Sequence, residues 1–385
     1  MKKILLLAIA AMTSVSCVYE FTPDILPADT KGLVVEGDII IGDESSFTLS
    51  SIEPLSGEKV APVRGWVWVE DDAGGEYYPE SLDASDSFTI DMTKASPDRK
   101  YRLRIRLATP LSGNSTFYSS EWKETQMAPS IDDLDYKWQQ VDPYSDPYAH
   151  LFLSLSSPGG SGCFRWDYEE IWEFHTEFMA THYFDPVTER VRSYGGQIPP
   201  LYNCWSYDNS HQAGLAIAKS TGGERISGFN FLDIDRRDLR MQTLYYIKLK
   251  ARNISEECYE YLHSIEVNST STGSLSQPDP SQIIGNIFND DDPLEVVYGY
   301  IEVSRVSTKD IYIDSIYLPP QEFIGEGPSP PPITSAEIGI MGPLEAYLNG
   351  FRPKNGSEWV AQECVECTAL GGTKIKPSFW PTPSE

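Results

Sequence analysis

The chain has 385 residues and a formal net charge of −27, because 57 acidic residues outnumber 30 basic ones. This length is enough for two domains, each with its own hydrophobic core. The acidic surface repels phosphate backbones, so we expect no nucleic-acid partner. Beyond a short leader, no apolar run approaches the ~20 residues that a transmembrane helix needs.

The leader, residues 1–16, has the pattern of a signal peptide. Two lysines follow Met1, and residues 4–12 are apolar, a run too short to span a bilayer. Small residues then lead to Cys17, and the segment resembles a bacterial lipoprotein signal. This resemblance implies that Cys17 becomes the acylated N-terminus, and several acyl chains suffice for stable anchoring. The alternative is an ordinary secretory signal without lipid.

Residues 17–30 are expected to form a lipidated tether. Pro23 and Pro27 disfavour regular structure, and two aspartates keep the segment in water.

The sequence pattern of residues 31–127 predicts a first domain built from short antiparallel strands. The clearest strand covers residues 101–107, where apolar side chains alternate with arginines. We therefore expect Leu103 and Ile105 to be buried, whereas the arginines face outward. These arginines are Arg102, Arg104 and Arg106. Short strands separated by Gly, Asp, Ser and Pro clusters favour an Ig-like or transthyretin-like β-sandwich.

Residues 128–385 predict a second β-rich domain, so the whole chain is expected to be mainly β. One helix should begin after Ser255, a good N-cap, since Glu256 and Glu257 suit the first turn. The tail from residue 333 is too short for a core of its own, so we expect it to pack on the second domain. Further strands are expected at residues 150–155, 163–174, 244–251 and 296–304.

Five cysteines follow Cys17, and export permits disulfides between them. They are Cys163, Cys204, Cys258, Cys364 and Cys367. The CxxC at the last two has no second ligand pair for zinc and no thioredoxin-like context, so we expect neither metal nor cofactor. At least one of Cys364 and Cys367 should bridge to an earlier cysteine. Cys204 is the favoured partner, because its neighbour Trp205 marks a core-facing position.

No catalytic motif stands out, and we expect a protein that is not an enzyme. Nucleophile-elbow, Walker, dinucleotide-binding and HExxH patterns are absent from the sequence. Adjacent carboxylates such as Glu169 and Glu170 point to opposite faces of a strand. Residues 289–292 form an oxygen-rich turn that lacks EF-hand spacing, so a solvated turn is favoured over a calcium site.

The strongest binding signal is the aromatic enrichment of residues 164–207, far above the 12% average of the chain. Aromatic faces with polar tips suit glycans, peptides and protein interfaces. We name Trp172 and Trp205 as candidate ligand-binding residues. The alternative is that most of these rings fill a β core.

Five stretches together resemble a family of Bacteroidota outer-membrane lipoproteins catalogued as domain of unknown function 4249. They are the leader and residues 33–37, 257–262, 285–304 and 364–380. The resemblance implies nutrient capture beside a TonB-dependent receptor and supplies no catalytic residues. We expect a lipid-anchored outer-membrane protein, on the cell surface rather than the periplasmic face. A structural or adhesive surface protein without a small ligand is the alternative function, and a hydrolase comes third.

Overall fold

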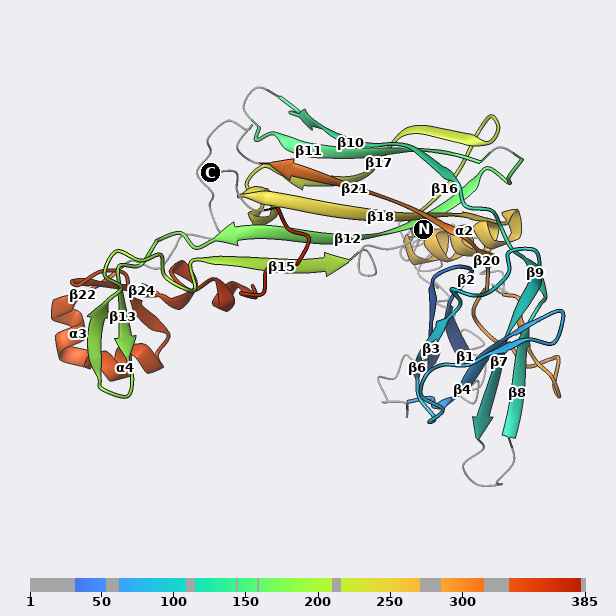
Figure 1. The fold of residues 1–385 in the computed structure, drawn as a ribbon, viewed down its shortest axis with the longest axis horizontal. Helices are drawn as coiled ribbons and strands as arrows, with labels where there is room; N and C mark the ends of the chain where they lie inside the picture. The colour runs from blue at the N-terminus through green and yellow to red at the C-terminus, as the bar shows by residue number, and fades with distance from the viewer. Residues whose placement is uncertain are drawn as a thin grey trace, which may run out of the picture.

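The computed structural model describes residues 32–52, 62–108, 115–142, 145–157, 159–209, 216–270, 285–314 and 332–381. Within them the chain is mainly β, and it forms two sandwiches and a small C-terminal unit in an elongated molecule (Figure 1). Cys17 and the tether lie outside the described residues. In the described part of the chain, no helix has the length and apolar character to cross a bilayer.

The first sandwich packs a small sheet against a larger one. The small sheet has the order β1 (Leu33–Gly37), β3 (Glu44–Ser51) and β6 (Ser87–Asp91). The larger sheet has the order β19 (Ile287–Asn289), β8 (Ser115–Ser120), β7 (Lys100–Ala108), β4 (Gly65–Asp71) and β5 (Glu76–Tyr77), with β9 (Lys123–Glu124) also paired to β7. All these pairs are antiparallel, and the side chains between the two sheets form one core.

The expected register of the arginine-rich strand is confirmed. Leu103 and Ile105 on β7 are 0% and 1% exposed, whereas the three arginines that alternate with them lie on the outer face. Alternation works here because successive side chains of a strand point to opposite faces of its sheet.

The first domain also takes in residues that the sequence assigned to the second. Strand β19 pairs with the edge strand β8, and Val297, Ile301 and Val303 lie in the first core. Strand β2 (Ile39–Ile40) pairs in parallel with β20 (Val303–Ser304). The boundary at residue 127 therefore does not separate the two cores. Local sequence patterns show that a segment is β, but not which distant strand it will join.

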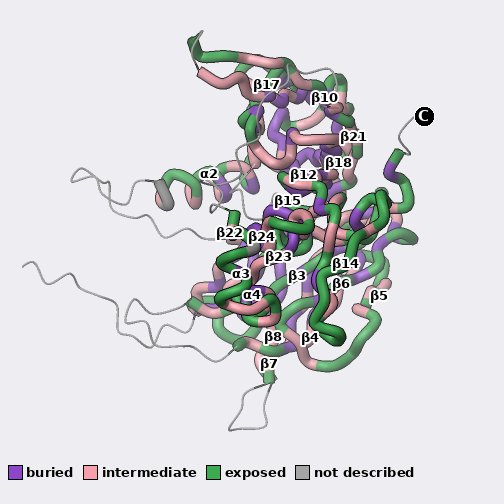
Figure 2. Tube along the Cα trace, turned by 90° about the vertical axis from the view of Figure 1, so that its left-hand side faces the viewer, coloured by how far each residue is buried: buried purple, intermediate pink, exposed green. Residues whose placement is uncertain are grey.

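The second sandwich also consists of two sheets around one core. One sheet has the order β10 (Ser130–Gln139), β11 (Tyr148–Ser156) and β17 (Arg225–Asp235). The other has the order β15 (Asn203–Asn209), β12 (Cys163–His175), β18 (Leu244–Ile254) and β21 (Val306–Asp314), with β16 (Ile217–Lys219) also on β12 and the short helix η2 (Leu239–Met241) before β18. Buried positions gather along the inner strands (Figure 2).

The helix α2 (Glu256–Thr270) begins where the sequence predicts. The Ser255 hydroxyl accepts a hydrogen bond from the backbone N–H of Cys258 at 3.2 Å, which caps the first turn. Cys258 and Leu262 are buried in a cluster with Cys163 and Ile254, so the apolar stripe is core.

The sequence predicted that the tail packs on the second domain, but only the second half of the tail does so. Its first half joins the connection between β12 and β15, and together they form a third unit with a core of Phe184, Ile338, Ala346 and Trp359. The two chain segments together bury apolar side chains that neither segment could bury alone. The unit contains β13 (His182–Asp185), β14 (Arg190–Ser193), β22 (Ile333–Thr334), α3 (Ser335–Met341), α4 (Pro343–Leu348), β23 (Phe351–Pro353) and β24 (Glu358–Ala361).

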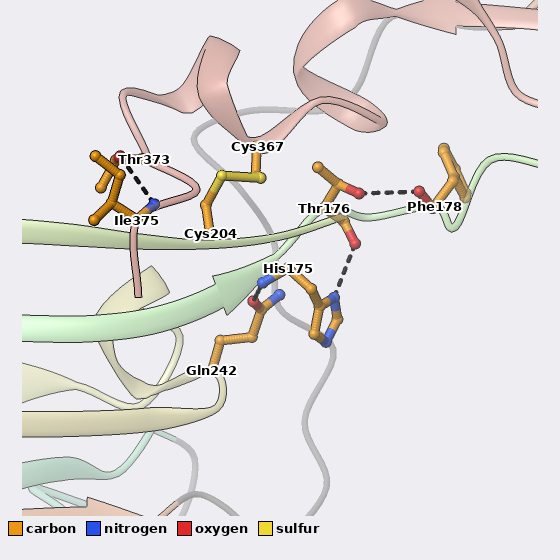
Figure 3. The surroundings of a disulfide bond; sticks show 8 residues. All are labelled: His175, Thr176, Phe178, Cys204, Gln242, Cys367, Thr373 and Ile375. Atoms are coloured by element: carbon orange, nitrogen blue, oxygen red, sulfur yellow. Dashed lines mark hydrogen bonds between the residues drawn. A yellow bond between two sulfur atoms is a disulfide. The ribbon is translucent and has the colours of Figure 1, made fainter. Parts of the chain in front are cut away.

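The second half of the tail returns to the second sandwich. After the short helices η4 (Gln362–Cys364) and η5 (Cys367–Leu370), Thr373 exchanges two backbone hydrogen bonds with Trp205 on β15. A disulfide joins Cys204 to Cys367 (Figure 3). The Cα atoms of the two residues are 5.8 Å apart. The expected pairing of Cys204 with a tail cysteine is confirmed.

A buried ionic network joins the two sandwiches. Asp38 of the first domain accepts hydrogen bonds from Arg165 at 2.9 Å and from Arg252 at 3.0 Å. Arg252 also pairs with Asp167 at 2.5 Å. The side chains of Asp38 and Arg252 are only 4% and 7% exposed, whereas those of Arg165 and Asp167 are 24% and 29% exposed, so the centre of the network is buried and its outer members reach water.

Candidate functional site

The outer face of the larger sheet in the first domain carries aromatic and charged side chains in register. On β4, Val67 and Val69 point into the core, so Trp66, Trp68 and Glu70 occupy the outer face. Their partners on β7 are Arg106, Arg104 and Arg102, in that order. We call these six residues the arginine–tryptophan face.

Guanidinium groups on this face stack on indole rings. The Cζ atom of Arg106 lies 4.0 Å from the ring centre of Trp66, and that of Arg104 lies 5.7 Å from Trp68. Arg102 extends the pattern, with its Cζ 4.6 Å from the ring of the exposed Trp122. Such contacts contribute roughly 0.5–1 kcal/mol each at exposed sites.

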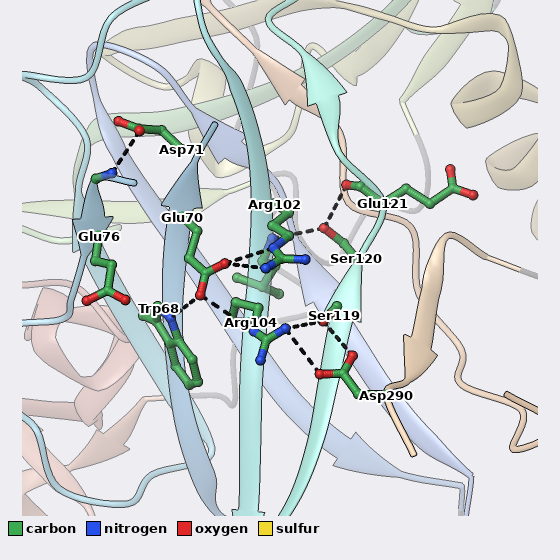
Figure 4. A network of polar contacts seen from close by, with 12 residues as sticks. Trp68, Glu70, Asp71, Glu76, Arg102, Arg104, Ser119, Ser120, Glu121 and Asp290 are labelled. Carbon is green, nitrogen blue, oxygen red and sulfur yellow. Dashed lines mark hydrogen bonds and ion pairs between the residues drawn. The ribbon is translucent and has the colours of Figure 1, made fainter. Parts of the chain in front are cut away.

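Two of the three arginines also pair with carboxylates. Arg102 Nη2 lies 2.6 Å from Glu70 Oε2, and Arg104 Nη1 lies 3.1 Å from Asp290 Oδ2 (Figure 4). Ser119 connects the second pair, because its hydroxyl donates to Asp290 and accepts from Arg104. The oxygen-rich turn is therefore partly engaged by this sheet. Among the described residues, no group of His, Cys, Asp or Glu is placed to hold a metal ion.

Arg106 differs from its two neighbours. No carboxylate among the described residues lies within ion-pair distance of its guanidinium, and no described acceptor receives a hydrogen bond from it. Its Nε atom is buried without a hydrogen-bond acceptor, as is that of Arg104. Stacking on Trp66 is thus the contact that holds the side chain in place.

Arg106 lines a hollow of about 310 Å³ at the end of the arginine–tryptophan face. Tyr78 stacks on Trp68 with ring centres 6.2 Å apart, and Trp66 Nε1 donates to the carbonyl oxygen of Leu82 at 3.0 Å. These contacts fix the walls, while Tyr78 stays 49% exposed. The volume is at the small end of ligand sites. The principal wall residues are Trp66, Trp68, Tyr78, Leu82, Arg106 and Phe117.

A second hollow of about 340 Å³ lies in the third unit. Met341, Leu344 and Leu348 line it, with Glu189 and Glu345 at its edge. Its described wall residues include no aromatic ring and no cation. It therefore has fewer groups that could bind a polar ligand than the first hollow has.

The structure places the residues that the sequence singled out in different surroundings. Trp172 and Trp205 are half-buried against the core clusters of the second domain, and neither lines one of the two hollows. Their role in ligand binding stays a prediction. Within the aromatic segment, Phe164, Trp166 and Phe174 are core residues.

Cys364, the remaining disulfide candidate, is buried and is not part of the Cys204–Cys367 bridge. Cys17 lies outside the described residues, so its acylation also stays a prediction.

The aromatic half of the site was not predicted from the sequence. Trp66 and Trp68 alternate with valines, and this alternation was a readable signal that both indoles share one face. The pairing of β4 with β7 places that face beside the arginines, and a single strand does not contain this information.

Comparison with known proteins gives one family. The family model described as Domain of unknown function (DUF4249) matches residues 18–310. No curated protein matches the chain. A solved segment of chicken tenascin with two fibronectin type III domains is 9% identical, with a TM-score of 0.16, covering 74% of this chain and 98% of that one. So low a TM-score carries no argument, and the β-sandwich assignment rests on the sheets described above.

Proposed function

Because this chain belongs to the family described as Domain of unknown function (DUF4249), we propose that it is a lipid-anchored outer-membrane protein that captures a ligand beside a TonB-dependent transporter. The hollow at the end of the arginine–tryptophan face is the observation that carries the capture role. Its principal walls are aromatic rings and the guanidinium of Arg106, with one exposed carboxylate, Asp83, and these groups suit binding of a ligand. The proposal therefore contains no chemical step.

A glycan is the ligand class that this hollow suits best. The hollow lies on the face of a sheet, whereas a peptide added as an extra strand needs a free sheet edge. One face of a sugar ring consists mainly of C–H groups, which pack on aromatic side chains, while its hydroxyls reach polar groups at the rim. Trp66, Trp68 and Tyr78 supply such rings around one hollow.

Binding to a glycan array tests the capture role. The full mature chain should bind a subset of glycans, and Trp68→Ala and Tyr78→Ala should each weaken that binding at least about tenfold, since stacking contacts are lost. Trp122→Ala is the matched control. Trp122 is an exposed indole on the same face but is not among the wall residues of the hollow. Failure to bind any glycan, or equal loss in the control, would refute glycan capture. Binding to a parallel peptide library instead would point to a peptide ligand.

The anchor is tested separately at Cys17. Mass spectrometry of the mature N-terminus should find an acylated cysteine, because the leader has the pattern of a lipoprotein signal. Cys17→Ala should release the protein from membranes. A mature N-terminus elsewhere, or wild-type protein that is soluble without detergent, contradicts the anchor.

Co-purification of a TonB-dependent receptor from detergent extracts of wild-type cells would support the transporter partner, and its absence would count against that part of the proposal.

A further inference from the structure

Arg106 has no carboxylate partner among the described residues, although the protein is strongly acidic. The chain has 57 acidic residues, so acids are plentiful, and the equivalent arginines two and four positions earlier on β7 each have one. Asp83 is the one acidic residue among the described walls of the hollow, and it is exposed and forms no ion pair with Arg106. The charge on Arg106 is therefore available to a ligand.

The position of Arg106 is also fixed before any ligand arrives. Its guanidinium lies over Trp66, whose own indole N–H is held by the carbonyl of Leu82. A rigid guanidinium offers a planar fork of N–H donors, and this fork matches the two oxygens of a carboxylate. Because the side chain is already ordered by stacking, less conformational entropy is lost when an anion binds.

We propose that the hollow recognises an acidic glycan, in which a uronic-acid carboxylate pairs with Arg106 while a sugar ring stacks on Trp68 and Tyr78. This inference rests on the proposed capture function and names its ligand class. The attraction is local, since charges beyond about 8–10 Å are screened at physiological salt. Acidic residues beyond that distance therefore do not prevent it, whereas Asp83 in the wall and Glu76, which accepts a hydrogen bond from the Tyr78 hydroxyl at 2.8 Å, require the ligand carboxylate to lie on the Arg106 side of the hollow.

Isothermal titration with defined sugars tests the inference. The probes are trimers of galacturonate, glucuronate and mannuronate, each compared with its own methyl ester, which keeps the ring but removes the charge. At least one acid should bind, and its ester should bind roughly tenfold to a hundredfold more weakly, as expected for loss of a charge-assisted hydrogen bond. Arg106→Gln should weaken binding of the acid to the level of the ester and leave the ester unchanged.

Arg102→Gln is the matched control for this experiment. It makes the same chemical change on the same face of β7, but Arg102 is paired with Glu70 and lies away from the hollow. The control should retain the preference for the acid. Circular dichroism should show that both variants fold.

The outcomes separate this inference from the function on which it rests. Esters that bind as tightly as acids, or a preference that survives Arg106→Gln, overturn the acidic-glycan inference and leave glycan capture standing. The same holds if the array finds neutral glycans and no uronate trimer binds. If neither the array nor the trimers give any binding, both proposals fall.

Discussion

Arg104 and Ile105 are adjacent on β7, yet their side chains have opposite surroundings. Ile105 is 1% exposed in the first core, next to inward-facing residues of both sheets. Arg104 lies on the outer face, where its side chain is 18% exposed and pairs with Asp290 and Glu70. A charged side chain at position 105 would therefore be surrounded by apolar groups, whereas one at position 104 is surrounded by charged groups and water.

We predict that Ile105→Asp prevents folding of the first domain. An unpaired carboxylate in this core loses its hydration without gaining a partner, a cost of several kcal/mol that is comparable to the stability of a domain. Arg104→Asp should leave a folded domain with a lower Tm, because it replaces ion pairs with repulsion at a partly exposed site on the outer face. Circular dichroism and thermal melting distinguish the two. Greater damage from Arg104→Asp would contradict the register.

Glu302 is a fully buried carboxyl at the junction of the two domains. The backbone N–H of Ser255 donates to its Oε2 at 2.8 Å, the hydroxyl of the same serine donates to it as well, and Val303 N–H donates to Oε1 at 3.1 Å. Burial raises the pKa of Glu302 above its ordinary 4.5 despite these donors, and the nearby Asp38 adds to the rise.

This raised pKa gives a pH-dependent prediction. Because the folded protein holds the Glu302 proton more tightly than the unfolded chain, the stability contribution is complete below pH 4.5 and is lost as pH rises through the folded pKa. Glu302→Gln cannot ionise, so its Tm relative to wild type should increase between pH 4 and pH 8. Melting curves of both proteins across this range provide the measurement, and other acids cancel in the difference. A constant or shrinking difference would contradict the assignment.

At the scale of elements, the Cys204–Cys367 bridge fastens the tail to the edge strand β15. It closes a sequence separation of 163 residues. Chain-entropy arguments give about 5 kcal/mol for so long a loop as an upper value. Backbone pairing of Thr373 with Trp205 and packing of Trp380 against Tyr246 hold the same segment. The bridge therefore also restrains the third unit, which precedes Cys367 in the chain.

We predict that the double variant Cys204→Ser, Cys367→Ser folds but loses protection in the tail. Hydrogen exchange should rise in residues 362–381 and in β15, while the core strands of the first sandwich stay protected, since local openings follow local contacts. Cys364→Ala is the control, because it alters a buried thiol of the same segment without breaking the bridge. Unchanged exchange in the double variant would show that packing alone holds the tail.

In the molecule as a whole, the features that could be predicted from the sequence are those that depend on residues close together in the chain. The β class, the start of α2 and the buried face of β7 all follow from local alternation, capping and periodicity. The return of β19 and β20 to the first domain depends on partners more than 160 residues away, such as β8 for β19. The third unit likewise pools two distant segments. The outward position of the arginines was predicted because it follows from alternation within one strand. The aromatic hollow around Arg106 was not predicted, because it depends on the pairing of two strands.

The joint between the sandwiches contains two kinds of ion pair. Asp38 binds Arg165 and Arg252 in a buried network, and Arg252 is 7% exposed. Asp43 and Lys250 also cross the joint, but they are 3.7 Å apart and their side chains are 41% and 34% exposed. Exposed pairs contribute roughly 0–1 kcal/mol, whereas removal of one partner from a buried pair costs roughly 3–5 kcal/mol.

We therefore predict that Asp38→Ala loosens the joint and Asp43→Ala does not. Without Asp38, the buried Arg252 keeps Asp167 as its one carboxylate partner among the described residues, so the closed arrangement loses its advantage over one in which water reaches the guanidinium. Small-angle X-ray scattering should show a larger radius of gyration for Asp38→Ala, and circular dichroism should show that its strands persist. Asp43→Ala should match wild type in both measurements. If Asp38→Ala scatters like wild type, or if Asp43→Ala opens the molecule equally, then the buried network does not set the arrangement of the two sandwiches.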